Sequence, residues 1–308
     1  MVKQQTICFH KNRQERFRYG NVPIYQCQAC DLIFTLPKQK RSNVKLLYQN
    51  YYKNEIPARF RFGLEYIVRL FRFFRAYKLY TIYPKAKSIL DIGSGRGFTL
   101  YYLKKYYHYK EAVGTQLNKT AVEFSRKKLG LTIYYKDLLN IDFGKEKFDL
   151  ITMWHVLEHV TRPEEYIRKI KMLLSRKGKI VIEVPNFNSW TRNLTGKYWL
   201  GLDPEYHLTF FTPKTISRLL KKYQFKIIQI HTFSLEYSTF ISVQSLVSRI
   251  TKTDQLFFKW LQTKVQNISL ISHVLLFILI TPISLLINLP SYFGKWGEVL
   301  LVVAEKKD

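Results

Sequence analysis

The decisive stretch of this sequence is Ser88-Ile89-Leu90-Asp91-Ile92-Gly93-Ser94-Gly95-Arg96-Gly97. A short apolar run leads into an acidic residue, and three glycines then follow at alternate positions. Because glycine has no Cβ, the backbone can turn sharply out of a strand here and let a ligand lie directly against it. A helix that begins at Phe98 would point its N-terminal amides and the positive end of its dipole at that ligand. The stretch therefore predicts a nucleotide-type site at the end of a first strand.

Phe98 narrows the choice of nucleotide. The dinucleotide fingerprint needs a small residue at this position, to pack the helix onto the strand, and phenylalanine does not meet that need. A phosphate loop of the G-x-x-x-x-G-K-S/T type is also absent from the sequence. What remains, D-x-G-x-G-x-G, resembles the first motif of class I S-adenosylmethionine (SAM)-dependent methyltransferases. The alternative for this motif alone is a glycine-rich turn without a ligand.

From Lys87 onward the chain alternates strand and helix patterns. Such alternation implies a parallel sheet covered on both faces, with ligands at the carboxyl ends of the strands. Polar groups follow the second, third and fourth strands, at Gln116, at Asp137 and at His155–His159. The expected strands are residues 88–92, 111–115, 131–135, 148–153, 179–184, 225–232 and 298–304.

A second signal is the stretch Phe148–Val160, which reads FDLITMWHVLEHV. It resembles a segment of SAM-dependent methyltransferases related to ubiquinone-type and sugar O-methyltransferases. Further on, Pro204–Thr212 resembles the HL-x-F-F-T segment of that group. The motifs occur in family order over most of the chain. The resemblance implies an α/β, Rossmann-like methyltransferase sheet of seven strands with the last strand antiparallel, and an enzyme that transfers a methyl group from SAM.

The resemblance also implies which residues bind the cofactor. The glycines would admit the methionine end of SAM, and Asp91 would help to hold its amino group. Asp137 would read the adenine amino group, although an aspartate there is also an ordinary helix N-cap. Gln116 stands where related folds place an acidic residue for the ribose, and an amide lacks that charge. The expected cofactor-binding residues are Asp91, Gly93, Ser94, Gly95, Gly97, Gln116, Leu117, Asp137, Leu138, Trp154 and His155.

Two histidines are the candidates for catalysis. Methyl transfer to an alcohol or phenol requires removal of the acceptor's proton, and histidine is the usual base near neutral pH. His207 lies in the segment that faces the substrate in related sugar methyltransferases, so the resemblance favours it as the base. His155 is expected near the methionine end of SAM or near the methyl group. His155 and His159 lie four residues apart with Glu158 between them, a spacing that can bind a metal or brace the loop.

The three cysteines, at positions 8, 27 and 30, all lie near the N-terminus. Cys27 and Cys30 form a C-x2-C pair, the usual half-site of a zinc ribbon, whereas Cys8 and His10 form an irregular first half. The alternatives are a structural zinc site of these four residues and a decayed ribbon without metal. So few cysteines argue against a secreted disulfide framework. Since the N-terminus also lacks an apolar leader, we expect a cytoplasmic protein.

Two further segments of the sequence are candidates for contact with a membrane. Residues 59–75 carry arginines beside an aromatic helical face, so they are expected to contact an anionic membrane or to cover a cofactor pocket with the arginines in solvent. Residues 265–294 contain no Asp, Glu, Lys or Arg. A single membrane crossing is excluded because the last strand must pair beside 225–232. The segment is therefore expected to be a helical hairpin broken at Pro282, an in-plane helix or a lid. Contact with anionic lipid is favoured by its flanking residues Lys252, Lys259, Trp260, Lys264, Lys295 and Trp296.

These observations predict a SAM-dependent O-methyltransferase at the inner face of the membrane, with a glycan, a lipid-linked intermediate or a quinone-like lipid as acceptor. The net charge of +28 favours anionic partners and supports an RNA methyltransferase as one alternative. A non-catalytic, membrane-associated scaffold of the same fold is the other. The expected regions are 1–36 (zinc-ribbon-like), 37–86 (linker and N-terminal cap helices), 87–239 (SAM-binding core), 240–296 (basic and hydrophobic helical insert, a membrane-interface hairpin) and 297–308 (last core strand).

Overall fold

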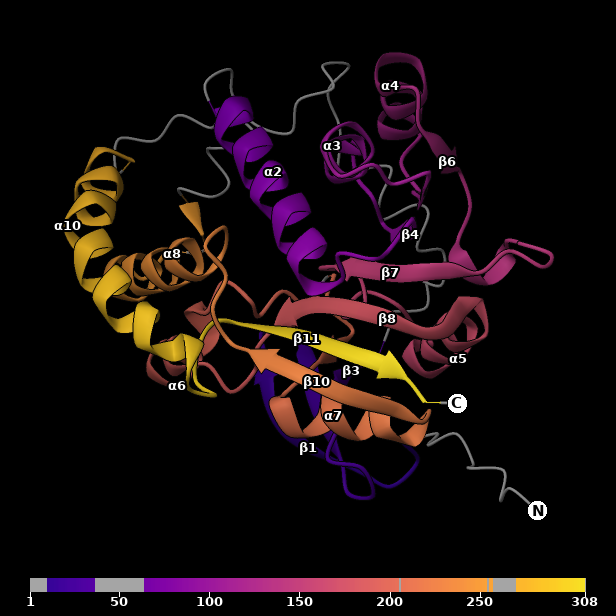
Figure 1. Ribbon diagram of the computed structural model, residues 1–308. Coiled ribbons are helices and arrows are strands. Elements are labelled where there is room, and N and C mark those ends of the chain that lie inside the picture. The colour runs from indigo at the N-terminus through magenta and orange to yellow at the C-terminus, as the bar shows by residue number, and fades with distance from the viewer. Residues whose placement is uncertain (1–9, 37–63, 205, 254, 257–269, 308) are drawn as a thin grey trace.

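A seven-stranded mixed sheet forms the centre of the molecule (Figure 1). The computed structural model describes residues 10–36, 64–204, 206–253, 255–256 and 270–307. The strand order is β10-β11-β8-β7-β4-β5-β6, with β11 antiparallel to both neighbours and the other pairs parallel. The predicted fold class is therefore confirmed. The strands are β4 (Ser88–Ile92), β5 (Glu111–Thr115), β6 (Thr132–Tyr134), β7 (Phe148–Trp154), β8 (Leu174–Pro185), β10 (Phe225–His231) and β11 (Val299–Lys306).

Helices cover both faces of this sheet (Figure 1). Ile89 and Leu90 are neighbours in β4, are both fully buried, and belong to separate hydrophobic clusters because successive strand residues point to opposite faces. The cluster around Leu90 includes side chains of α5 and α7, and the cluster around Ile89 includes side chains of α2 and α3. Burial on both faces explains why β4 is an unbroken run of buried residues. The helices are α2 (Leu64–Ile82), α3 (Phe98–Tyr106), α4 (Lys119–Leu129), α5 (Pro163–Leu173) and α7 (Pro213–Lys222).

The strand order reverses between β4 and β7, where the chain continues to β5 on one side and to β8 on the other. Loops that leave two such strands in opposite directions open a crevice at their carboxyl ends. The glycine loop leaves β4 at this edge, and His155 follows β7 at the same edge. The sheet thus brings together the two strongest motifs of the sequence, which lie about sixty residues apart.

A second, four-stranded sheet has the order β1-β2-β3-β9 and is made mainly from the N-terminal segment. Its fourth strand comes from the core, because Ile33 of β3 pairs with Phe210 of β9. Side chains from the N-terminal strands and from the core share one hydrophobic cluster, with Ile24 and Phe210 both buried in it. The N-terminal region is therefore fixed to the segment that carries His207. The strands are β1 (Arg13–Tyr19), β2 (Val22–Cys27), β3 (Ile33–Thr35) and β9 (Thr209–Phe210).

Between β10 and β11 the chain forms helices at one end of the sheet (Figure 1). α8 (Ser238–Thr251) packs on α6 (Trp190–Thr195), and α10 (Leu270–Asn288) packs on α8. A short 3-10 turn, η4 (Leu289–Tyr292), leads from α10 toward β11. α10 continues through Pro282, so the hairpin broken at that residue is wrong. Of the residues thought to flank this insert, Lys259, Trp260 and Lys264 lie outside the described residues.

Candidate active site

The three glycines after β4 all have left-handed backbone conformations, with φ of 74° at Gly93, 56° at Gly95 and 75° at Gly97. A Cβ on Gly93 would lie 2.4 Å from Val156 Cγ2, and one on Gly97 would lie 2.6 Å from Leu131 Cδ1. A Cβ on Gly95 would have no neighbour within 4 Å in the part of the chain that the structure describes. Packing thus requires two of the glycines, while the third borders open space in which a ligand can approach the backbone.

Asp91 is the last residue but one of the strand that leads into this loop, and its side chain is almost completely buried. Its Oδ1 accepts a hydrogen bond of 2.6 Å from Thr152 Oγ1 of the neighbouring strand β7. Burial raises the pKa of Asp91 to about 6, despite the opposing hydrogen bond and the nearby arginines. An ammonium group placed against this carboxyl would favour its ionised form, so the residue suits the amino group of an amino-acid ligand.

Gln116, which follows β5, is also buried, and its side chain folds back on the chain. Its Oε1 accepts hydrogen bonds from the backbone N–H groups of Leu117 (2.7 Å) and Asn118 (3.1 Å). The family resemblance puts this residue at the position that holds the ribose. With the oxygen engaged in this way, the amide nitrogen is the part of Gln116 suited to a ribose, as a donor.

Asp137, which follows β6, has both carboxylate oxygens engaged within the protein. Oδ1 accepts a 2.9 Å hydrogen bond from Leu139 N and caps the turn η2 (Leu138–Asn140). Oδ2 accepts a hydrogen bond from the Tyr166 hydroxyl of α5. The N-cap function considered for Asp137 is therefore present in the structure, and its role toward adenine stays a prediction. Tyr166 was not recognised in the sequence, because nothing local to α5 marks it as a partner of β6.

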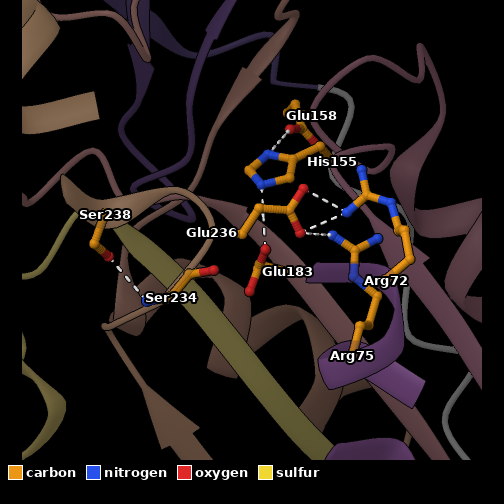
Figure 2. A network of polar contacts seen from close by, with 8 residues as sticks. All are labelled: Arg72, Arg75, His155, Glu158, Glu183, Ser234, Glu236 and Ser238. Atoms are coloured by element: carbon orange, nitrogen blue, oxygen red, sulfur yellow. Dashed lines mark hydrogen bonds and ion pairs between the residues drawn. The ribbon is translucent and has the colours of Figure 1, made fainter. Parts of the chain in front are cut away.

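His155 lies between two buried glutamates immediately after β7 (Figure 2). Its Nδ1 is 3.2 Å from Glu158 Oε1, and its Nε2 is 3.3 Å from Glu183 Oε1 of β8. The backbone N–H of His155 donates to Glu183 O at 2.8 Å, with φ at 53°. Burial alone would lower the pKa of His155, but its contacts with the two carboxylates outweigh burial and raise the pKa well above the usual range. The ring is therefore an imidazolium at neutral pH and has no lone pair with which to accept a proton.

Two arginines of α2 point into the same region and bind Glu236, which precedes α8 (Figure 2). Arg75 Nη2 lies 2.7 Å from Glu236 Oε2, and Arg72 contacts both carboxylate oxygens. Burial would raise the pKa of Glu236, but the two guanidinium groups outweigh it and lower the pKa to about 2. Arg75 also lies 4.1 Å from the centre of the Trp154 ring. α2 packs on α3, and the expectation that its arginines lie in solvent is wrong for these two.

His159 and His207 form a second histidine cluster, with ring centroids 4.7 Å apart. His159 Nδ1 lies 2.9 Å from Tyr206 O, and His207 Nδ1 lies 2.9 Å from Gly201 O. A carbonyl can only accept, so each Nδ1 carries the proton and each Nε2 carries a lone pair when the ring is neutral. Burial lowers the pKa of His159 to about 4, which keeps that ring neutral.

Glu158 connects the two clusters. One of its oxygens contacts His155, and the other is buried and has no hydrogen-bond partner among the described residues. Ligand atoms of Glu158, His159 and His207 all lie within 4.8 Å of one another, so these residues could also hold a divalent cation. The spacing of His155 and His159 left open a metal pair or a brace for the loop; the two ring nitrogens of His155 contact Glu158 and Glu183, and this group of three residues does not include His155.

Three of the four predicted zinc ligands come together at the N-terminal sheet. Ligand atoms of His10, Cys27 and Cys30 lie within 4.8 Å of one another, and Cys30 Sγ is 3.4 Å from His10 Nδ1. Burial lowers the pKa of His10, which favours the neutral form that metals bind. Cys8, the fourth predicted ligand, lies outside the described residues.

A family model described as "Methyltransferase domain" matches residues 59–230, which is more than half of the chain. The match covers the glycine loop, both histidine clusters and most of the sheet. The chain belongs to this methyltransferase family. The order of its sheet and the glycine loop after β4 agree with a class I, SAM-dependent enzyme.

The methyltransferase is also similar to curated relatives and to solved structures. The ubiquinone biosynthesis O-methyltransferase of Coxiella burnetii is 26% identical over 129 residues, which are 39% of this chain and 54% of the relative. The enzyme of the same name from Histophilus somni is 30% identical over 134 residues, 39% of this chain and 55% of the relative. The chain thus spans about half the length of these relatives. A SAM-dependent methyltransferase from Archaeoglobus fulgidus has a TM-score of 0.49 at 18% identity, covering 86% of this chain and all of that one.

Proposed function

We propose that this methyltransferase methylates a hydroxyl or phenol oxygen of a glycan, a lipid-linked intermediate or a quinone-like lipid at the cytoplasmic face of a membrane. The observation that carries the choice of oxygen is the His159–His207 pair, in which the hydrogen bond from His207 Nδ1 to Gly201 O leaves Nε2 as the ring atom that can accept a proton. The curated relatives named above are O-methyltransferases, which supports the same choice.

The residues around the glycine loop fit SAM. Gly95 borders open space, Asp91 offers a buried carboxyl for an ammonium group, and the Gln116 amide is placed after β5 for a ribose. When bound, SAM supplies an electrophilic methyl group on a sulfonium. Because the donor is already activated, the protein contributes mainly position and the removal of one proton.

His207 is the residue that we assign to the proton. Its Nδ1 donates to Gly201 O, which fixes the ring and leaves Nε2 as the basic atom. His159 beside it is neutral, so it places no second positive charge against the protonated His207 ring. The proton of the acceptor hydroxyl would pass to His207 Nε2 as the oxygen takes the methyl group.

His155 has a different role in this proposal. As an imidazolium between Glu158 and Glu183 it braces the loop after β7, and its ring packs 4.3 Å from that of Tyr237. It thereby positions both Glu158, which borders the His159–His207 pair, and Tyr237, which leads into α8. We treat His155 as a positioning residue rather than a base.

The choice of acceptor is tested by incubating the protein with methyl-labelled SAM and separate lipid, glycan, RNA and protein fractions. We expect label in the lipid or glycan fraction, in a linkage that behaves as a methyl ether. Label confined to RNA would favour the RNA methyltransferase, and tight SAM binding without transfer to any fraction would favour the scaffold.

We also propose that Cys8 completes a structural zinc site with His10, Cys27 and Cys30. The convergence of the other three ligands supports this proposal. Metal analysis of the purified protein should find one zinc per chain, and Cys30→Ser should lose most of it. Wild-type protein that is folded and free of zinc would contradict the proposal.

A further inference from the structure

α10 has the polarity of its two sides reversed relative to a helix on the surface of a soluble protein. Within residues 271–288, whose burial is described, the buried ones are His273, Ser284 and Asn288, which are all polar. Its exposed residues are mostly large and apolar, whereas soluble helices turn that side toward the core. The exposed apolar side chains, between 38% and 71% exposed, are Ile271, Leu275, Ile278, Leu279, Ile283, Leu285, Leu286 and Ile287.

Polar contacts at both ends fix the buried side of α10 in place. Near its C-terminus, Asn288 Nδ2 donates to Ser242 Oγ of α8 (2.7 Å) and to Ser284 Oγ (3.0 Å), and Trp190 Nε1 of α6 donates to Asn288 Oδ1 (3.2 Å). Near its N-terminus, His273 Nε2 lies 2.8 Å from Thr253 Oγ1. Small and polar residues at a helix interface are typical of helices packed in membranes. Rotating α10 to bury its apolar side would break these contacts.

We propose that the outward face of α10 lies in the plane of an anionic phospholipid bilayer. Residues 265–294 carry no charged side chain, while the exposed cations Lys252 and Lys295 stand at the two ends of the helix. Two aromatic side chains after α10 are exposed to solvent, Phe293 to 91% and Trp296 to 46%. Exposed aromatic side chains of this kind are common at the level of the lipid headgroups. With a net charge of +28, anionic lipid is a more favourable partner than a second copy of the chain.

The helix lies along the membrane surface and does not cross it. Among the described residues, one helical segment, Ile271–Tyr292, is long and apolar enough to span a bilayer, with a mean hydropathy of 2.2. However, β10 and β11, which precede and follow the insert, pair directly, with His231 opposite Leu301. The polar side of α10 is also bonded to α8 and α6, so lipid cannot surround the helix. An in-plane helix buries its apolar face to a depth of about 5–10 Å, which matches the one-sided exposure of α10.

α8 links this surface to the candidate active site. It begins at Ser238, two residues after Glu236, which binds Arg72 and Arg75 (Figure 2). The residue between them, Tyr237, has its ring 4.3 Å from that of His155. The helix that holds α10 therefore starts at the wall of the crevice. The membrane contact of α10 extends the proposed function. It rests on that function in one respect, that the docked enzyme would take its acceptor from the bilayer.

Vesicle flotation tests the surface without any methyl transfer. Wild-type protein is mixed with vesicles of phosphatidylcholine alone and of phosphatidylcholine with phosphatidylglycerol. The double variant Leu275→Glu/Leu286→Glu changes two exposed positions of α10, and Met172→Glu changes an exposed apolar residue of α5 as the matched control. We expect the wild type and the control to float with the anionic vesicles, and the double variant to bind them at least about tenfold more weakly.

Other outcomes overturn the inference. Equal flotation of the double variant would show that α10 is not the contact. A wild type that stays with the unbound fraction would show that there is no lipid surface, and a lipid-free dimer that the double variant dissociates would assign this face to a second copy.

Thermal unfolding and SAM binding check that the double variant is folded. A blue shift of wild-type tryptophan emission on adding anionic vesicles, lost in Trp296→Phe, gives a second readout. Vesicle binding without lipid methylation would leave this inference standing and reject the proposed acceptor.

Discussion

His207 and His159 come from segments 48 residues apart in sequence, and their rings meet edge to face with centroids 4.7 Å apart, each with Nδ1 bound to a backbone carbonyl. If His207 is the base, His207→Asn should lower kcat by about 10²- to 10⁴-fold, because asparagine cannot accept the proton. The affinity for SAM should not change. His108→Asn, at an exposed histidine, is the control. Steady-state turnover and calorimetric SAM binding measure the two effects, and an unchanged kcat would remove His207 from this role.

The open space beside Gly95 predicts a selective effect of adding a methyl group there. Gly95→Ala should weaken SAM binding by about tenfold or more, because the Cβ would occupy the space in which the cofactor meets the backbone. Gly144 has the same φ of 56°, and none of the described residues lies within 4 Å of a Cβ added there. Gly144→Ala should therefore carry a similar cost in stability, on the order of 1 kcal/mol, with normal SAM affinity. Similar SAM affinities in the two variants would contradict a ligand at Gly95.

The hydrogen bonds of Gln116 predict that a carboxylate at this position would bind the ribose of SAM more tightly than the amide does. In Gln116→Glu one oxygen can still accept from Leu117 N and Asn118 N, and the other becomes available to a ribose hydroxyl with charge assistance. We expect SAM affinity to rise about tenfold. Gln229→Glu, at an exposed position on β10, controls for the change in net charge. Weaker SAM binding in Gln116→Glu than in wild type would show that the ribose is not held here.

The Arg72–Glu236–Arg75 cluster predicts a pH-dependent contribution to stability. The pKa of Glu236 is lowered from 4.5 to about 2, so its contribution is present above pH 4.5 and is lost as the pH falls toward 2. Glu236→Gln should destabilise the protein by about 3 kcal/mol at neutral pH, and by less as the pH drops below 4.5. Glu165→Gln, which breaks the surface pair with Arg162, should cost less than about 1 kcal/mol. Urea unfolding across this pH range measures both variants, and a pH-independent difference would contradict the assignment.

The features that local sequence predicts are those set by local chemistry. The glycine loop can be recognised in the sequence because positive φ values and closely packed neighbouring side chains restrict the residue type at Gly93 and Gly97 to glycine. The parallel pairing of the core strands follows from the alternation of strands and helices, and the pairing of β4 with β7 brings the glycine loop and His155 to the same edge of the sheet.

The features that the sequence did not reveal depend on contacts between distant segments. Glu236 binds two arginines that lie more than 160 residues away in the sequence, and no sequence pattern around Glu236 predicts that pairing. The strand pairing of Ile33 with Phe210 fixes the N-terminal region to the core in the same way. At Pro282 the expectation of a break failed because a proline is tolerated within a helix that neighbouring contacts hold in place, here those of Ser284 and Asn288 with Ser242.

Calorimetric titration of SAM into the purified wild-type protein and into Gly95→Ala tests the central claim most directly. The account predicts one saturable site per chain in the wild type and an affinity at least about tenfold lower in the variant. A wild-type protein that shows no heat of binding, or a Gly95→Ala protein that binds as tightly as wild type, would contradict it.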